Sequence, residues 1–111
     1  MNNELIKPAM EILTFAGDAR LSAKNALLAV QKQDFSEARK CLDEAKKEIV
    51  KAHSAQTKII QDEARGKEYE YCMLFNHAQD TLMTINSEVE LVSSLIDTFE
   101  VYTHLMNGDR E

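Results

Sequence analysis

Apolar residues recur every three or four positions along almost the whole chain, which is the spacing of a helix with one buried face. The pattern divides into three long segments and predicts helices over about residues 3–31, 34–65 and 69–107. The links between them are short, so neighbouring helices are expected to run antiparallel. The predicted fold is all-α: a single domain over residues 1–111, built as an antiparallel three-helix bundle that runs up, down and up.

Each predicted helix has its own row of apolar or small residues, and these rows predict the core. In the first helix the row contains one charged misfit and consists of Ile6, Met10, Leu13, Gly17, Leu21, Lys24, Leu27 and Leu28. In the second helix the row is rich in alanine and consists of Phe35, Ala38, Leu42, Ala45, Ile49, Ala52, Gln56 and Ile59. In the third helix the row consists of Phe75, Ala78, Leu82, Ile85, Val89, Val92, Ile96, Phe99, Thr103 and Met106.

A few residues predict how the helices begin and end. Pro8 falls in the first turns of the first helix, where its missing N–H costs little. Asp34, with Glu37 three residues on, is positioned to cap the second helix. Gly66 is expected to end that helix in a left-handed conformation. Gly17 is expected where another helix or a partner approaches closely, because glycine inside a helix costs about 1 kcal/mol relative to alanine.

The third segment carries a second apolar stripe on a different face of its C-terminal half, formed by Leu91, Leu95, Thr98, Tyr102 and Leu105. One stripe is enough to pack within a three-helix domain, so a second stripe requires another partner. In a chain of 111 residues the simplest partner is another copy of the same chain. The pattern therefore predicts an oligomer.

Composition and charge argue against several classes of fold and function. Three Gly and one Pro are too few for folds that need many tight turns. Lys and Arg number 13 against 19 Asp and Glu, and the net charge of −6 argues against a nucleic-acid partner. No window approaches the roughly 18 apolar residues that span a membrane, so membrane insertion is not expected.

The N-terminal residues lack the basic and apolar regions of a secretory signal, which predicts a cytoplasmic protein. Cys41 and Cys72 lie within helical patterns without CxxC spacing. We expect both thiols to be reduced and half-buried, and no zinc site on them. No HExxH, P-loop or G-x-G-x-x-G motif occurs.

The histidines are the remaining candidates for chemistry. His77, Asp80 and Thr84 follow i, i+3, i+7 spacing and project from one side of the third helix. If that side is the oligomer contact, Asp80 meets its copies near a symmetry axis, where like charges are unfavourable unless a cation or protons intervene. An ordinary solvated His–Asp pair is the alternative interpretation.

The positions of the other two histidines do not require a chemical role. His53 has a polar partner, Gln56, one turn further on, and periodicity alone favours a surface position for it. His104 lies near the C-terminal end of the last helix, where a cation suits the helix macrodipole.

Three motifs together resemble a known family: Ala16-Gly17-Asp18-Ala19-Arg20, Ala52-His53-Ser54-Ala55-Gln56-Thr57 and His77-Ala78-Gln79-Asp80-Thr81-Leu82-Met83-Thr84. Their order and spacing are similar to those of the enzyme IIA component of the lactose/cellobiose (diacetylchitobiose) class of the bacterial phosphotransferase system. The similarity extends from about Glu11 to Tyr102.

The resemblance implies a homotrimer whose three-helix subunits form a nine-helix bundle. It implies that His77 accepts a phosphoryl group from the phosphocarrier HPr and passes it to the cognate enzyme IIB, which functions with a membrane enzyme IIC. It further implies that Asp80 of each subunit reaches the trimer axis, where a divalent cation, expected to be Mg²⁺, binds to oxygen ligands. Gln79, Gln56 and His53 are candidate supporting donors for the phosphoryl oxygens.

One position departs from the family pattern, because Thr81 stands where a second histidine usually follows the aspartate. Two alternative functions remain open. A non-enzymatic helical adaptor would use the second stripe to dock a partner helix. A histidine phosphotransfer domain of two-component signalling would require His-x-x-Lys-Gly, whereas His77 is followed by Ala78-Gln79-Asp80-Thr81. The component is not expected to bind sugar, so its sequence does not distinguish lactose, cellobiose and diacetylchitobiose.

Overall fold

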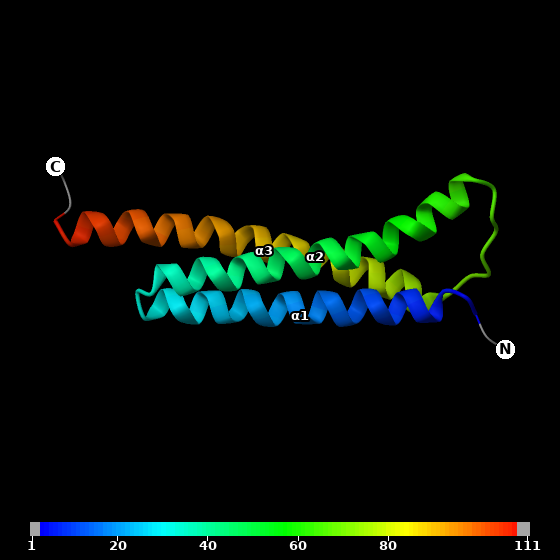
Figure 1. Cartoon of the computed structure of the whole chain (residues 1–111), viewed down its shortest axis with the longest axis horizontal. Helices are drawn as coiled ribbons and strands as arrows, with labels where there is room; N and C mark the ends of the chain where they lie inside the picture. The colour runs from blue at the N-terminus through cyan, green and yellow to red at the C-terminus, as the bar shows by residue number, and fades with distance from the viewer. Residues whose placement is uncertain (1–2, 109–111) are drawn as a thin grey trace.

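The computed structural model describes residues 3–108 and confirms the predicted all-α three-helix bundle. Helix α1 spans Ile6–Gln31, α2 spans Phe35–Ala64 and α3 spans Met73–Met106, and no strand occurs within the described part of the chain. Figure 1 shows the up-down-up arrangement, in which α3 runs in the same direction as α1. The bundle is elongated, with extents of 63 × 23 × 17 Å.

The turn between α1 and α2 is built as the sequence predicts. The side chain of Asp34 accepts a hydrogen bond from the backbone N–H of Glu37 at 3.1 Å, which caps α2. Just before it, Gln33 takes a left-handed φ of 59°, and the N–H of Asp34 donates to the carbonyl of Ala29 at 2.9 Å. These bonds satisfy groups at both helix ends and make the turn only a few residues long.

The link between α2 and α3 differs from the prediction, because α3 begins at Met73 and not near residue 69. Gly66 ends α2 at a φ of 99°, as expected. Residues 67–72 are not helical, and Cys72, the residue before α3, has an extended backbone with φ −141° and ψ 106°. Two side-chain contacts link this segment to other parts of the chain: Lys67 pairs with Glu4 at 2.8 Å, and the hydroxyl of Tyr69 donates to Asp62 at 2.8 Å.

The predicted core rows of α2 and α3 are largely confirmed. Every member of the α2 row is buried or half-buried, and the α3 row is buried from Phe75 to Ile96. Beyond that point the row fails, since Phe99 is 46% and Met106 79% exposed. The reason is visible in Figure 1: α3 runs past the turn that joins α1 and α2, so its last turns have no helix to pack against.

The predicted core row of α1 is mostly wrong, since only Leu13 and Leu27 of its members are half-buried against the core. The residues that α1 buries are Ala9, Ile12, Ala16, Ala19, Ala23, Ala26 and Ala29. Four of its larger apolar residues lie outside, with Ile6 45%, Met10 51%, Leu21 59% and Leu28 44% exposed. The prediction weighted side-chain size, whereas close approach to two neighbouring helices requires small side chains on the shared face.

Gly17 is exposed, and a Cβ added to it would meet nothing within 4 Å. The close approach of another helix of the same chain, which its position suggested, is therefore not found. A partner from outside the chain stays a prediction.

We predict that Ala16→Leu lowers the free energy of unfolding by about 1–3 kcal/mol, because Ala16 is 0% exposed and the added atoms have no space. Urea unfolding at one fixed protein concentration measures the change. Gly17→Ala is the matched control on the adjacent residue, and it should not reduce helix stability because the added methyl meets open space. Equal stability of Ala16→Leu and the parent chain would contradict this account of the core.

Candidate functional site

Contacts with the other two helices define the sides of α3. On one side, which we call the α1 flank, Glu88 forms two hydrogen bonds of 2.9 Å with Arg20. On another, which we call the α2 flank, Gln79 and Asp97 both contact α2. The outer row lies between these flanks, opposite the core, and consists of Asp80, Thr84, Ser87, Leu91, Thr98, Tyr102 and Leu105.

The ion pairs that define these sides were not predicted from the sequence. Arg20 and Glu88 are 68 residues apart, and Arg39 pairs with Asp97 at 3.0 Å across 58 residues. Arg39 also pairs with Glu100. Periodicity finds neighbours one turn apart on the same helix, so it contains no signal for pairs that only the packing of two helices brings together.

His77 lies in the second turn of α3 and is exposed. Glu88 follows it by eleven residues, about three turns, so His77 belongs to the α1 flank. Asp80 is also exposed and begins the outer row. Among the described residues, no side-chain hydrogen bond or ion pair occupies either of them. Both side chains are therefore available to groups from outside the chain.

The predicted supporting residues meet one another but not His77. Gln56 donates from Nε2 to Oε1 of Gln79 at 2.9 Å across the α2–α3 contact, and both side chains are partly buried. His53 lies one turn before Gln56 on α2 and is half-buried. Gln79 is only two residues from His77, but two residues turn a helix by about 200°. The structure therefore places His77 and the Gln56–Gln79 pair on opposite flanks of α3.

Thr81, His104 and the second apolar stripe are the remaining candidates from the sequence, and all lie on α3. Thr81 is half-buried one turn after His77. His104 lies in the last turn of α3, as expected for a cation near a helix C-terminus. Leu91, Tyr102 and Leu105 of the second stripe are 61%, 60% and 51% exposed. Only Leu95 of its apolar members is half-buried, so most of the stripe is uncovered within one chain.

Residues 3–108 contain no group of three or more His, Cys, Asp or Glu side chains suited to a metal ion. Asp80 alone offers one carboxylate, whereas Mg²⁺ requires several oxygen ligands. The donor type fits a hard divalent cation, but the number of ligands fits only if copies of Asp80 come together.

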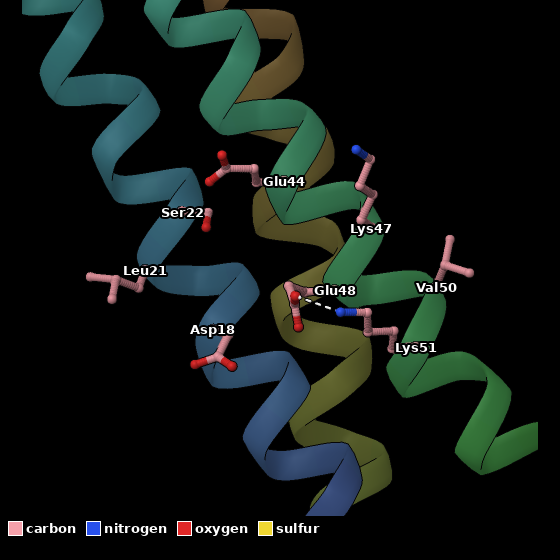
Figure 2. Close-up of a pocket in the computed structure, with 8 residues that line it drawn as sticks. All are labelled: Asp18, Leu21, Ser22, Glu44, Lys47, Glu48, Val50 and Lys51. Carbon is pink, nitrogen blue, oxygen red and sulfur yellow. Dashed lines mark hydrogen bonds and ion pairs between the residues drawn. The ribbon is translucent and has the colours of Figure 1, made fainter.

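A groove of the described surface lies between α1 and α2 and not at His77. It has a volume of about 630 Å³. Figure 2 shows it bordered by Asp18, Leu21 and Ser22 of α1, with Glu48 and Lys51 of α2 joined by an ion pair of 3.1 Å. Neither His77 nor Asp80 lines it. His77 thus stands on an open surface, where another macromolecule can reach it.

No helix in the described part of the chain is long and apolar enough to cross a membrane.

The comparison with known families agrees with the arrangement of helices and motifs. Residues 7–100 match the family model of the lactose/cellobiose-specific IIA subunit of the phosphotransferase system (PTS). The chain belongs to this family and is therefore an enzyme IIA component of a sugar-uptake phosphotransferase system.

Individual relatives cover nearly the whole chain. The lichenan-specific phosphotransferase enzyme IIA component of Bacillus subtilis (strain 168) is 38% identical over 103 residues, which cover 93% of this chain and 94% of that protein. The lactose-specific EIIA component of Staphylococcus epidermidis is 37% identical over 81% of this chain and 86% of its own. The crystal structure of the cellobiose-specific enzyme IIA from Bacillus anthracis superimposes with a TM-score of 0.86 at 33% identity, covering 93% of this chain and 94% of that one.

The two cysteines are free thiols, and both are half-buried, as the sequence predicts. Burial raises the pKa of the Cys41 thiol, and a hydrogen bond of 3.4 Å from its Sγ to the carboxylate of Glu37 raises this pKa further. A raised pKa lowers the fraction of thiolate, which is the reactive form, at any pH below it.

We predict that Cys41 alkylates slowly near pH 8 and speeds up only as the pH rises above the ordinary thiol range. Glu37→Gln should lower the pKa of Cys41 and raise its rate of alkylation at pH 8. Iodoacetamide labelling of a Cys72→Ser background, followed by mass spectrometry, measures Cys41 alone. Unchanged labelling in Glu37→Gln would show that the carboxylate does not influence the thiol.

Proposed function

We propose that the chain is a phosphocarrier of sugar uptake, which accepts a phosphoryl group from phospho-HPr on His77 and passes it to the cognate enzyme IIB in the cytoplasm. The sugar would be a β-linked disaccharide of the lactose, cellobiose or diacetylchitobiose type. One observation carries this proposal: His77 is exposed, has no partner among the described residues and lies on an open surface. Such an imidazole can meet two different proteins in turn.

The position of His77 near the start of α3 supports a role as phosphoryl acceptor. No side chain caps the N-terminus of α3, so the positive end of the helix dipole stays available. A helical side chain leans toward the N-terminus of its helix, and His77 therefore leans toward this end. A phosphoryl group on the ring is an anion, and anions are stabilised at helix N-termini.

The transfer itself requires only the ring of His77. The lone pair of one ring nitrogen forms the new N–P bond while the N–P bond of the donor phosphohistidine breaks. The electron pair of the broken bond stays on the donor nitrogen. The donor ring takes up a proton and the ring of His77 releases one, so that charge balances. Transfer to enzyme IIB repeats these steps in the opposite direction, and no sugar pocket is needed.

We propose that three copies assemble around the outer rows of α3 as a homotrimer. The exposed second stripe supports this, because Leu91, Tyr102 and Leu105 would bury large apolar surface against their copies. Such an axis would bring three Asp80 carboxylates together. They would hold a divalent cation, expected to be Mg²⁺, whose charge offsets their mutual repulsion.

A helical adaptor is the second candidate, favoured by the same exposed stripe. An adaptor would keep its partner after replacement of His77 and would carry no phosphoryl group. The two candidates therefore differ in the outcome of one labelling experiment.

We predict that phosphoenolpyruvate, enzyme I and HPr add one acid-labile phosphoryl group per chain, and that His77→Ala abolishes this labelling. Isotope incorporation and intact-protein mass spectrometry measure it, with acid treatment to test the N–P bond. His104→Ala is the matched control, because it removes an imidazole from the far end of the same helix and should leave labelling intact. Full labelling of His77→Ala would overturn the assignment of the acceptor.

We also predict that the chain is a trimer in solution and that Asp80→Leu abolishes binding of divalent cations while keeping the helical fold. Light scattering measures the mass, calorimetry with Mg²⁺ measures binding and circular dichroism measures the fold. The exposed position of Asp80 in the single chain is the reason that the fold should survive. A monomeric parent chain, or Mg²⁺ binding that persists in Asp80→Leu, would contradict the proposed axis.

A further inference from the structure

The sequence Asn107-Gly108 follows directly after α3, whose last residue is Met106. Both residues are exposed, and they lie at the end of α3 that runs past the turn between α1 and α2 (Figure 1). An asparagine followed by glycine is chemically reactive, because the backbone nitrogen of the glycine can attack the side-chain amide. Whether the attack occurs in a folded chain depends on how firmly the backbone holds that nitrogen.

The reaction would join the backbone nitrogen of Gly108 to the side-chain carbon Cγ of Asn107. The nitrogen loses its proton, the bond between Cγ and Nδ2 breaks and ammonia leaves, which closes a succinimide ring. Water then opens the ring at either of its carbonyl carbons. The product is aspartate, or isoaspartate in which the main chain runs through the former side chain. Both products carry a carboxylate in place of a neutral amide.

The backbone around Asn107 leaves the attacking nitrogen within reach. Gly108 has no side chain to shield it, and its φ of 81° is a left-handed conformation that glycine adopts freely. Its N–H donates to the carbonyl of Leu105 at 3.2 Å, a bond at the long end of the normal range. Ring closure requires rotation about the Cα–C bond of Asn107, whose ψ of 4° has already left the helical range. This end of α3 therefore offers little resistance to the rotation.

The other asparagines of the described chain are held against the same reaction. Asn25, Asn76 and Asn86 lie inside α1 and α3, where the following N–H donates to a carbonyl four residues back. Helical hydrogen bonds on both sides of each asparagine oppose the rotation that closes the ring. Asn3 is held by its side-chain amide, which accepts a backbone hydrogen bond of 2.9 Å and donates one of 3.0 Å.

We infer that Asn107 is a site of spontaneous deamidation, which the other asparagines among residues 3–108 resist, and that the reaction loosens the last turns of α3. The new carboxylate lies at the C-terminal end of α3, where the helix macrodipole is negative and an anion is unfavourable. It also adds one negative charge to a chain whose net charge is −6. This modification depends neither on the proposed phosphocarrier function nor on the trimer.

The last turns of α3 are sensitive to such a charge because little covers them. Val101, Tyr102, Leu105 and Met106 are 60%, 60%, 51% and 79% exposed. Few packing contacts support the helix there, so its backbone hydrogen bonds carry most of its local stability. Tyr102 and Leu105 also end the second apolar stripe, so the modification changes the charge beside that surface.

The experiment ages the full chain in mildly alkaline buffer and digests samples with a protease that cleaves after glutamate. Cleavage after Glu100 releases residues 101–111 as one peptide, and the same digest yields the peptides that contain Asn25, Asn76 and Asn86. Mass spectrometry measures the small mass gain of an amide that becomes a carboxylic acid, and chromatography separates aspartate from isoaspartate. Asn107 should react at least about 10-fold faster than the three helical asparagines, because opening a helix interior costs more than opening a frayed end.

A second measurement follows the effect on α3. Amide hydrogen exchange in residues 101–106 should be about two- to fivefold faster in the aged chain than in the fresh chain, as expected for an unfavourable charge at a helix end. Asn107→Asp carries the product from the start and should show the faster exchange at once. Asn107→Gln is the matched control, which keeps a neutral amide at this position and should keep the slow exchange after ageing.

An Asn107 that reacts no faster than the three helical asparagines would overturn the site. Exchange in Asn107→Asp that equals that of the fresh parent chain would overturn the loosening of α3. His77 lies at the other end of the same helix, so its labelling by phospho-HPr tests the proposed function separately. Failure of that labelling would leave the reaction at Asn107 unchanged.

Discussion

The alanine face of α1 is the constraint on which the rest of the structure depends. Of the seven residues that α1 buries, six are alanine, and α2 adds Ala38, Ala45 and Ala52 to the same core. Small side chains let helix backbones approach closely, but each alanine removes little apolar surface from water. The bundle is therefore thin and depends on precise spacing more than on the amount of buried surface.

The same constraint moves the large apolar side chains outward. The shared face of α1 is alanine except for Ile12, and Ile6, Met10 and Leu21 lie on its exposed side. The C-terminal half of α3 adds Leu91, Tyr102 and Leu105. A thin core with a broad apolar surface is typical of a chain that completes its packing with copies of itself.

The sequence predicted most of the fold because helical periodicity is a local property. The rows of α2 and α3, the Asp34 cap and the Gly66 terminator all follow from residues within a few turns of one another. Prediction from the sequence failed where contacts with residues far along the chain determine the local structure. α3 starts at Met73 and not near residue 69, after a link in which the carbonyls of Glu70 and Tyr71 accept hydrogen bonds from Asn3 at the other end of the chain. Most of the predicted α1 row lies outside the core, because the other two helices pack against the small residues of α1.

For the site, the sequence by itself determined the residue types and their motifs, and through them the family and the candidate acceptor His77. Only the tertiary structure decided which of these residues meet. Gln56 and Gln79 are 23 residues apart and bond at 2.9 Å, whereas Gln79 and His77 are near neighbours in sequence and face opposite ways. The physical reason is that a helix turns about 100° per residue, so direction is set by position on the helix, while contact is set by the packing of different helices.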